Sequence, residues 1–121
     1  MKNFLIILAI SLFWSNVSIA NYNCSYNVWF KIGPEGELQK KVIKMTVSFK
    51  DEKTLRIFDH EIDSYYSDEF FVLENNNKTI QGIFSDSKKI RSFILDKQTR
   101  YSQWTSVWGK GSTTVHHGYC K

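Results

Sequence analysis

The chain has 121 residues, a length that accommodates one hydrophobic core and a single small domain. Its 16 lysines and arginines exceed its 12 aspartates and glutamates, which gives a formal net charge of +4 at pH 7. This mildly basic balance lies far below the charge density of a dedicated nucleic-acid-binding protein, so we expect no nucleic acid among its partners.

Residues 1–20 have the layout of a cleavable signal peptide rather than of a retained membrane anchor. Lys2 supplies a positive charge, an almost unbroken apolar run follows at 4–13, and small side chains occupy the ends of the Ser-Ile-Ala tripeptide at 18–20. The apolar run is too short to span a bilayer, which needs about 20 residues. We therefore expect one mature domain of residues 21–121, secreted or periplasmic, without membrane insertion after cleavage.

Cys24 and Cys120 are the two cysteines of the chain. An even number of cysteines in an exported protein predicts a disulfide, because the compartment is oxidising. Such a bond would tie the first predicted strand to the last. The Asn-Tyr-Asn sequence at 21–23 lacks the small and apolar residues that precede a lipid-attachment cysteine, and a two-cysteine metal site has no supporting partner spacing.

Alternation of apolar and polar residues predicts short β-strands along the whole mature chain. The clearest case is 43–50, where every odd position is apolar and every even position is polar. Polar and glycine-containing turns separate the strands, and 59–66 could hold a short helical turn. The predicted strands are 22–31, 43–50, 54–62, 69–74, 79–85, 90–96, 100–108 and 113–120. The sequence thus predicts an all-β domain, a single small antiparallel meander, barrel or sandwich of about eight strands closed by one N-to-C-terminal disulfide.

Two segments near the C-terminus resemble the end of many small exported bacterial proteins of unknown function. Residues 93–99 read Phe-Ile-Leu-Asp-Lys-Gln-Thr, and the chain closes with Gly-Tyr-Cys at 118–120. In those proteins a strand of the form Phe-x-Leu-Asp-Lys-x-Thr leads into a final Gly-x-Cys. The resemblance implies a β-meander over the last third of the chain and no particular activity.

A second resemblance is to the membrane-bound and periplasmic inhibitors of c-type lysozyme, which are small eight-stranded barrels. Tyr101 followed by Trp108-Gly-Lys-Gly is similar to the Tyr and the later Trp-x-Lys-Gly of that family, and the two cysteines are similarly placed. The family inserts this lysine into the lysozyme cleft, so the resemblance implies that role for Lys110. The family also has Ser-Gly shortly before the tyrosine, where this chain has Gln-Thr-Arg at 98–100.

The histidines and acidic residues are of the types that bind metal ions, but their spacing along the predicted strands does not favour a metal site. His116 and His117 are adjacent, and adjacent strand residues point to opposite faces, so the pair cannot readily hold one ion. On a strand, the acidic residues Asp59, Glu61 and Asp63 would share a face, either as oxygen ligands of a cation or as charges that protect a strand edge from pairing. We expect the second role, no metal and no cofactor.

The most informative cluster is aromatic and contains Tyr101, Trp104 and Trp108, with Lys110 beside it. Aromatic residues with basic neighbours form stacking surfaces and interface hot spots, although core packing would explain one face of the strand equally well. Two glycines at 109 and 111 permit a tight reversal that would push Lys110 outward. We name these four residues as the candidate binding residues.

No signature of an enzyme is present in the sequence. The chain has no Gly-x-Ser-x-Gly motif, no phosphate-binding glycine loop and no cysteine left over for a Cys–His pair. We therefore expect a non-enzymatic exported β-domain, a binding or inhibitory module with a protein partner. The alternatives are an inhibitor of c-type lysozyme, or a structural or accessory protein of the cell envelope. The sequence alone gives no oligomeric state.

Overall fold

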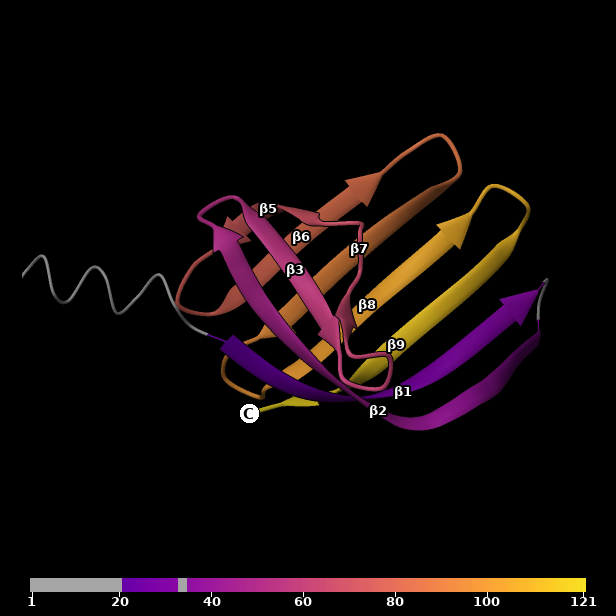
Figure 1. Ribbon diagram of the computed structural model, residues 1–121, viewed down its shortest axis with the longest axis horizontal. Coiled ribbons are helices and arrows are strands. Elements are labelled where there is room, and N and C mark those ends of the chain that lie inside the picture. Colours follow the sequence, from indigo (N-terminus) through magenta and orange to yellow (C-terminus); the bar gives the residue numbers. More distant parts are fainter. Residues whose placement is uncertain (1–20, 33–34) are drawn as a thin grey trace, which may run out of the picture.

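The computed structural model describes residues 21–32 and 35–121, which form a closed antiparallel β-barrel (Figure 1). Each strand of the ring pairs with the next, and β1 also pairs with β9, so the first and last strands complete the closure. A two-residue strand, β4 (Ser64–Tyr65), adds to the side of β3. The eight strands of the ring are β1 (Asn21–Ile32), β2 (Glu35–Asp51), β3 (Thr54–Asp59), β5 (Phe70–Asn75), β6 (Thr79–Ser85), β7 (Lys89–Asp96), β8 (Tyr101–Trp108) and β9 (Ser112–Cys120).

The structure confirms the all-β prediction and selects the barrel from the architectures that the sequence left open. The predicted signal peptide lies outside the described residues. The turns of the barrel gather at two ends (Figure 1). We call the end with the 86–88 and 109–111 turns the hairpin end. The other end, with the 76–78 and 97–100 turns and with Asn21 and Lys121, we call the terminal end.

The core fills the barrel because alternate residues of every strand point inward, as a period of two requires. On β8, for example, Ser102, Trp104 and Ser106 are buried while the residues between them are partly exposed. Burial of large apolar side chains from seven of the eight strands, β1 to β8 without β4, is the main stabilising term. The buried apolar side chains of the described residues include Tyr22, Tyr26, Val28, Met45, Val47, Leu55, Ile57, Phe70, Ile80, Phe93, Leu95 and Trp104.

Two strand boundaries differ from the predicted ones by more than one residue. The strand predicted at 43–50 begins at Glu35, because its first half pairs with the second half of β1 as a long ribbon. The strand predicted at 54–62 ends at Asp59, and a hydrogen-bonded turn without helix follows at 60–63. Asp63 there has a φ of 53°, in the left-handed region that aspartate tolerates better than most residues.

The predicted disulfide between Cys24 and Cys120 is present, and it lies on the seam where the chain closes on itself. The two cysteines are direct register partners on β1 and β9. Beside them, Asn23 and Lys121 exchange two backbone hydrogen bonds, with N···O distances of 3.4 and 2.8 Å. The bond therefore cross-links one end of the ladder that joins the first strand of the ring to the last.

Gly118 makes the same seam possible by its lack of a side chain. A Cβ built on Gly118 would overlap the carbonyl oxygen of Ser25 on β1. We expect Gly118→Ala to lower the free energy of unfolding by on the order of 2 kcal/mol, because backbone of one strand would have to move. Gly109→Ala is the control, since its Cβ would meet nothing closer than 3.6 Å. Urea unfolding of both variants is the measurement, and equal midpoints would contradict this account of the seam.

Candidate functional site

Two neighbouring turns form the hairpin end, and a hydrogen bond ties them together. The β6–β7 turn and the β8–β9 turn lie next to each other in Figure 1. The backbone N–H of Gly109 donates to the carbonyl oxygen of Lys88 across 2.9 Å. Within the first turn, the carboxylate of Asp86 accepts the backbone N–H groups of Lys88 and Lys89 at 2.8 and 2.9 Å. These bonds favour the ionised carboxylate, so they lower the pKa of Asp86.

The turn that carries Lys110 is a three-residue hairpin loop. The N–H of Gly111 donates to the carbonyl oxygen of Trp108 across 3.0 Å, and Gly111 has a φ of 88°. This is the usual construction of such a loop, a tight turn followed by one left-handed residue. The tight reversal that the two glycines permit is formed, and of the two it is Gly111 that adopts the left-handed conformation. Lys110 is exposed at the tip.

A hollow of about 430 Å³ opens between the two turns, lined by Ser87, Lys88, Trp108, Gly109, Lys110 and Ser112. Trp108 is half-buried and forms a wall of the hollow, and the ammonium of Lys89 lies 4.7 Å from its ring centre. A cation over an indole face is attracted by the electrons of the ring, which helps to hold the tryptophan in place. The side chains that line the hollow include two lysines and no carboxylate, so this concavity has a positive potential.

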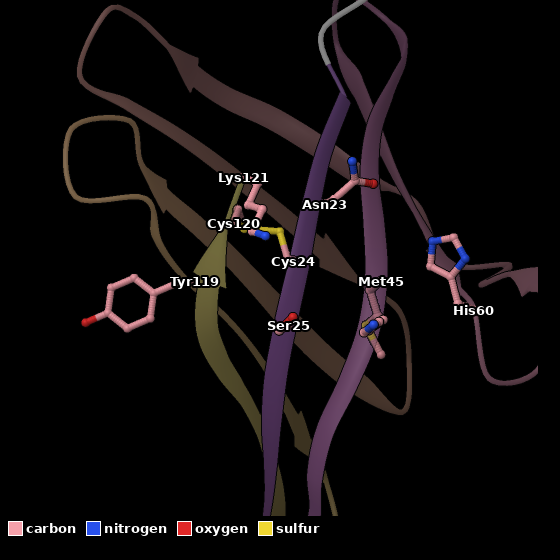
Figure 2. A pocket seen from close by; sticks show the side chains of 9 residues that line it. Asn23, Cys24, Ser25, Met45, His60, Tyr119, Cys120 and Lys121 are labelled. Carbon is pink, nitrogen blue, oxygen red and sulfur yellow. A yellow bond between two sulfur atoms is a disulfide. The ribbon is translucent and has the colours of Figure 1, made fainter.

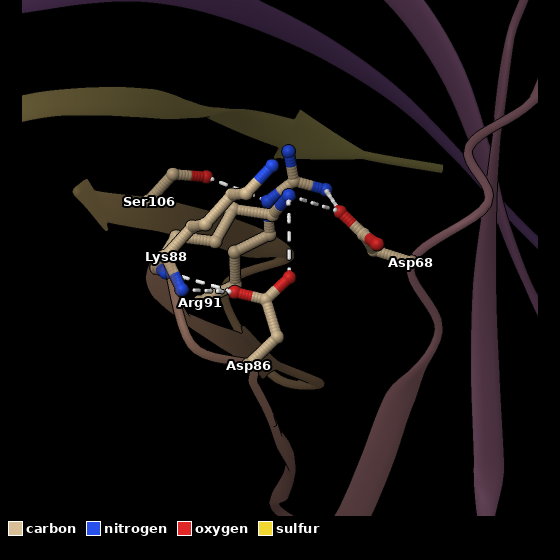
Figure 3. A network of polar contacts seen from close by, with 6 residues as sticks. Asp68, Asp86, Lys88, Arg91 and Ser106 are labelled. Carbon is tan, nitrogen blue, oxygen red and sulfur yellow. Dashed lines mark hydrogen bonds and ion pairs between the residues drawn. The ribbon is translucent and has the colours of Figure 1, made fainter. Parts of the chain in front are cut away.

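Beside the hollow, the cations of β7 form a network of ion pairs with nearby carboxylates (Figure 3). Lys89 and Arg91 each approach the carboxylate of Asp68 to 2.9 Å, and Lys89 also lies 3.8 Å from Asp86. The Nε–H of Arg91 donates to the hydroxyl of Ser106 across 2.9 Å. Asp68 belongs to the segment between β3 and β5, so the network ties that segment to β7. Within the described part of the chain, no comparable ion pair engages the ammonium groups at the rim of the hollow.

Polar groups also lie inside the barrel, beneath the segment that carries Asp68. The hydroxyl of Tyr66 donates to the buried carboxylate of Asp59 across 2.7 Å. Burial, followed by this hydrogen bond and the charge of Asp59, raises the pKa of Tyr66. The indole of Trp104 stacks on the imidazole of His116, with ring centres 3.7 Å apart and planes inclined by 12°.

The pKa of His116 is also perturbed. Burial, followed by the charge of Arg91, lowers its pKa to about 4, while Asp59 acts in the opposite direction. Among the described residues, Trp104 Nε1 and His116 Nδ1 are buried without a hydrogen-bond partner. A neutral imidazole stacked on an indole is a packing arrangement, and we assign these residues to the core.

The four candidate binding residues therefore separate into different places. Trp108 and Lys110 lie together at the hairpin end, whereas Trp104 is 2 % exposed and belongs to the core. Tyr101 lies at the other end of β8, on the outer face, where its ring packs on Tyr119 and its hydroxyl donates to Gln103. Over eight strand residues this places Tyr101 roughly 23 Å from Trp108.

Lys88 is the residue of this site that the sequence analysis missed. It stands in a turn, and nothing in the local pattern of 85–88 indicates that another hairpin would come to lie beside it. The available signal was that two successive predicted hairpins, β6–β7 and β8–β9, each carry a lysine in their turn. The antiparallel pairing of β7 with β8, in which Lys89 and Trp108 are register partners, makes these turns neighbours.

A second hollow, of about 540 Å³, lies at the terminal end beside the disulfide (Figure 2). Its lining includes Asn23, Lys44, His60 and Lys121, with Tyr119 pointing away from it in the view. None of the described residues that line this hollow is a tryptophan, and we give it less weight than the hairpin end.

The structure separates the groups that suggested a metal. His116 points into the barrel and His117 points out, where its ring stacks on Trp29 with centres 6.4 Å apart. Asp59 is buried, while Glu61 and Asp63 lie exposed on the following turn, so the three carboxylates do not share a strand face. The described residues contain no group of three or more metal-ligating side chains.

Comparison of the chain with protein-family models, with curated proteins and with solved structures finds no match. A search of the described residues for a helix long and apolar enough to cross a bilayer returns none. At the level that the fold defines, the chain is a small disulfide-closed antiparallel β-barrel, and the bond is consistent with an oxidising compartment.

Proposed function

We propose that this chain is an exported binding or inhibitory protein whose hairpin end inserts into an acidic concavity of a partner protein. One observation carries the proposal. Lys110 projects from a hydrogen-bonded turn at the rim of a hollow, beside a fixed tryptophan and a second exposed lysine, Lys88. A cation held in this way loses little conformational freedom when it binds, so more of its interaction energy appears as affinity.

The chemistry of the hairpin end indicates the kind of partner. Tryptophan is among the residues most often found at interface hot spots, and lysines at the rim steer association with negatively charged surfaces. Binding of this type weakens as salt screens the charges, with a Debye length of about 8 Å at physiological ionic strength. The partner should therefore present carboxylates in a recess wide enough for one hairpin.

C-type lysozyme is the first partner to test, because its cleft holds two catalytic carboxyl groups and because the resemblance assigns an inserted lysine to Lys110. The position that corresponds to the family's Ser-Gly, at 98–100, lies in a turn of the terminal end. That turn cannot enter the same cleft as Lys110. In the proposed mode Lys88, joined to Gly109 by the bond between the turns, supplies the second contact.

The variant Lys110→Ala is expected to weaken inhibition of c-type lysozyme at least tenfold, since a paired charge in the cleft would lose its partner. Lys88→Ala should weaken inhibition by a smaller factor, because it lies in the adjacent turn. Titration of lysozyme activity against the mature protein is the measurement. Lys78→Ala is the matched control, an exposed turn lysine at the terminal end.

Absence of inhibition at micromolar protein would reject lysozyme as the partner and favour an accessory role in the cell envelope. Inhibition that is unchanged in Lys110→Ala and Lys88→Ala would reject the hairpin end as its cause. Loss of inhibition at high salt, with the wild type retaining its fold, would agree with the proposed charge pairing.

Export is part of the proposal, with residues 1–20 as the signal peptide and the mature chain in the periplasm or outside the cell. The mature protein is expected to begin at Asn21, because the Ser-Ile-Ala sequence precedes it. Intact mass of the exported protein checks this expectation. A mass that retains residues 1–20 would contradict it.

A further inference from the structure

We infer that the outward face of β5 to β8 is the self-association surface of this protein, and that the mature chain forms a symmetric dimer through it. The inference is independent of the proposed partner at the hairpin end. It starts from a continuous set of exposed apolar side chains on four adjacent strands. Their members are Phe71, Leu73, Ile83, Ile90, Ile94 and Val107, which are 38–58 % exposed.

The register makes these side chains one surface. Phe71 pairs directly with Ile83 across β5 and β6, and Ile90 pairs directly with Val107 across β7 and β8. Ile94 lies opposite Gln81, diagonal to Ile83. A groove of about 220 Å³ runs through the middle of this face, lined by Leu73, Ile83, Ser92, Ile94, Gln103 and Thr105 among others. Apolar ridges beside a groove allow two copies of the same face to interlock.

Charge is the second observation. Between 81–83 on β6, 90–94 on β7 and 103–107 on β8, the outward-facing residues of these described strands are apolar, hydroxyl or amide residues without a charge. The cations of β7, Lys89 and Arg91, turn inward to Asp68 instead. Soluble surfaces usually mix both signs of charge at about 25–35 % of residues, so a face without charge over its β6–β8 part is unusual. The exposed carboxylate of Glu74, the register partner of Gln81, lies at the β5 edge of this face.

The absence of charge favours a second copy of this chain over other occupants. Without residues 1–20, which carry only Lys2, fifteen basic side chains stand against twelve acidic ones, a net charge of +3. Two copies would repel each other through most of their surface, and this face is where they can approach without that cost. An isologous dimer places the same patch against itself, which suits an uncharged surface.

The size of the face is adequate for such a contact. A large apolar side chain has a full accessible area of roughly 150–200 Å². The exposed fractions of the six residues therefore leave on the order of 500 Å² of apolar surface. This area is at the upper end of the range for the largest apolar patch on a monomer. The intervening serine, threonine and glutamine residues bring the face toward the ~800 Å² that each partner buries in a standard interface.

Sedimentation equilibrium of the mature, disulfide-bonded protein over 1–200 µM tests the inference. A mass that rises from monomer to dimer with concentration is expected, and Ile94→Lys should weaken association at least tenfold by placing two lysines in the contact. Ser92→Arg, a change at an exposed position of the same face, is a second variant for the case that Ile94→Lys fails to fold. Ile62→Lys, on a turn outside the face and 59 % exposed, should leave association unchanged.

The ionic strength supplies a further readout. A dimer joined by this uncharged face should persist or strengthen from 50 mM to 500 mM salt, because repulsion between the cationic copies is screened. A chain that stays monomeric at 200 µM would overturn the inference. A dimer that dissociates in salt, or one that both face variants leave intact, would place the contact elsewhere and overturn it as well.

Discussion

Replacing Cys24 and Cys120 together with serine is expected to lower the free energy of unfolding by about 4–5 kcal/mol, the largest single effect we predict. The bond closes a loop with a sequence separation of 96 residues, and in the chain-entropy model the stabilisation grows with loop length. Small domains have total stabilities of about 5–15 kcal/mol, so the variant should lie close to its unfolding transition at 37 °C.

Urea unfolding of the double variant, compared with wild type with and without reductant, measures this effect. Reduced wild type and the double variant should have the same midpoint, since both lack the same cross-link at the seam of the barrel. Thiol titration of denatured, unreduced wild type should find no free thiol. Two reactive thiols per chain, or a midpoint that reductant leaves unchanged, would contradict the structural role of this bond.

The second large effect concerns pH. We expect the protein to lose about 3 kcal/mol of stability through His116 as the pH falls from 6.5 to 4. The folded state holds this imidazole neutral, with its pKa lowered to about 4 by burial and by the charge of Arg91, while the unfolded chain protonates it near pH 6.5. The unfolded state therefore binds more protons in this window, so stability falls with falling pH.

A variant at His116 isolates this contribution from that of the carboxylates. His116→Phe keeps a flat ring against Trp104 and removes the titrating group, so the difference between its unfolding free energies at pH 7 and pH 4.5 should shrink by a few kcal/mol. His117→Phe, on the outer face, is the control and should retain the pH dependence of wild type. Equal pH profiles for wild type and His116→Phe would exclude His116 as the source.

The period-2 pattern was sufficient to predict the fold class, because every strand of the ring carries one buried and one exposed face. It failed for the first half of β2, where the residues after 35 show no regular alternation and pair with β1 only because the two strands form a ribbon. It also placed Asp59 in an exposed acidic run. In the structure Asp59 is buried because it shares the inward face of β3 with Leu55 and Ile57, and the hydroxyl of Tyr66 donates to its carboxylate.

The site was predictable only in part for the same reason. Trp108 and Lys110 are close in sequence, and their shared turn follows from local chemistry. Their relation to Lys88, by contrast, depends on the register of β7 with β8, in which Lys89 lies opposite Trp108. Trp104 and Trp108 are four residues apart and share one face of β8, but this spacing could not tell that the first lies in the core and the second at its rim. How deeply a strand residue is buried depends on how far the neighbouring strands extend beside it. Trp104 lies between Phe93 and His116, whereas Trp108 lies opposite Lys89, the first residue of β7.

The most direct test of the proposed binding mode is amide hydrogen exchange of the mature protein, alone and saturated with c-type lysozyme. The proposal predicts slower exchange at 86–89 and 108–112, the two turns of the hairpin end, and unchanged exchange at 76–78 and 97–100. Protection at the terminal end, or no complex and hence no protection at either end, would contradict it.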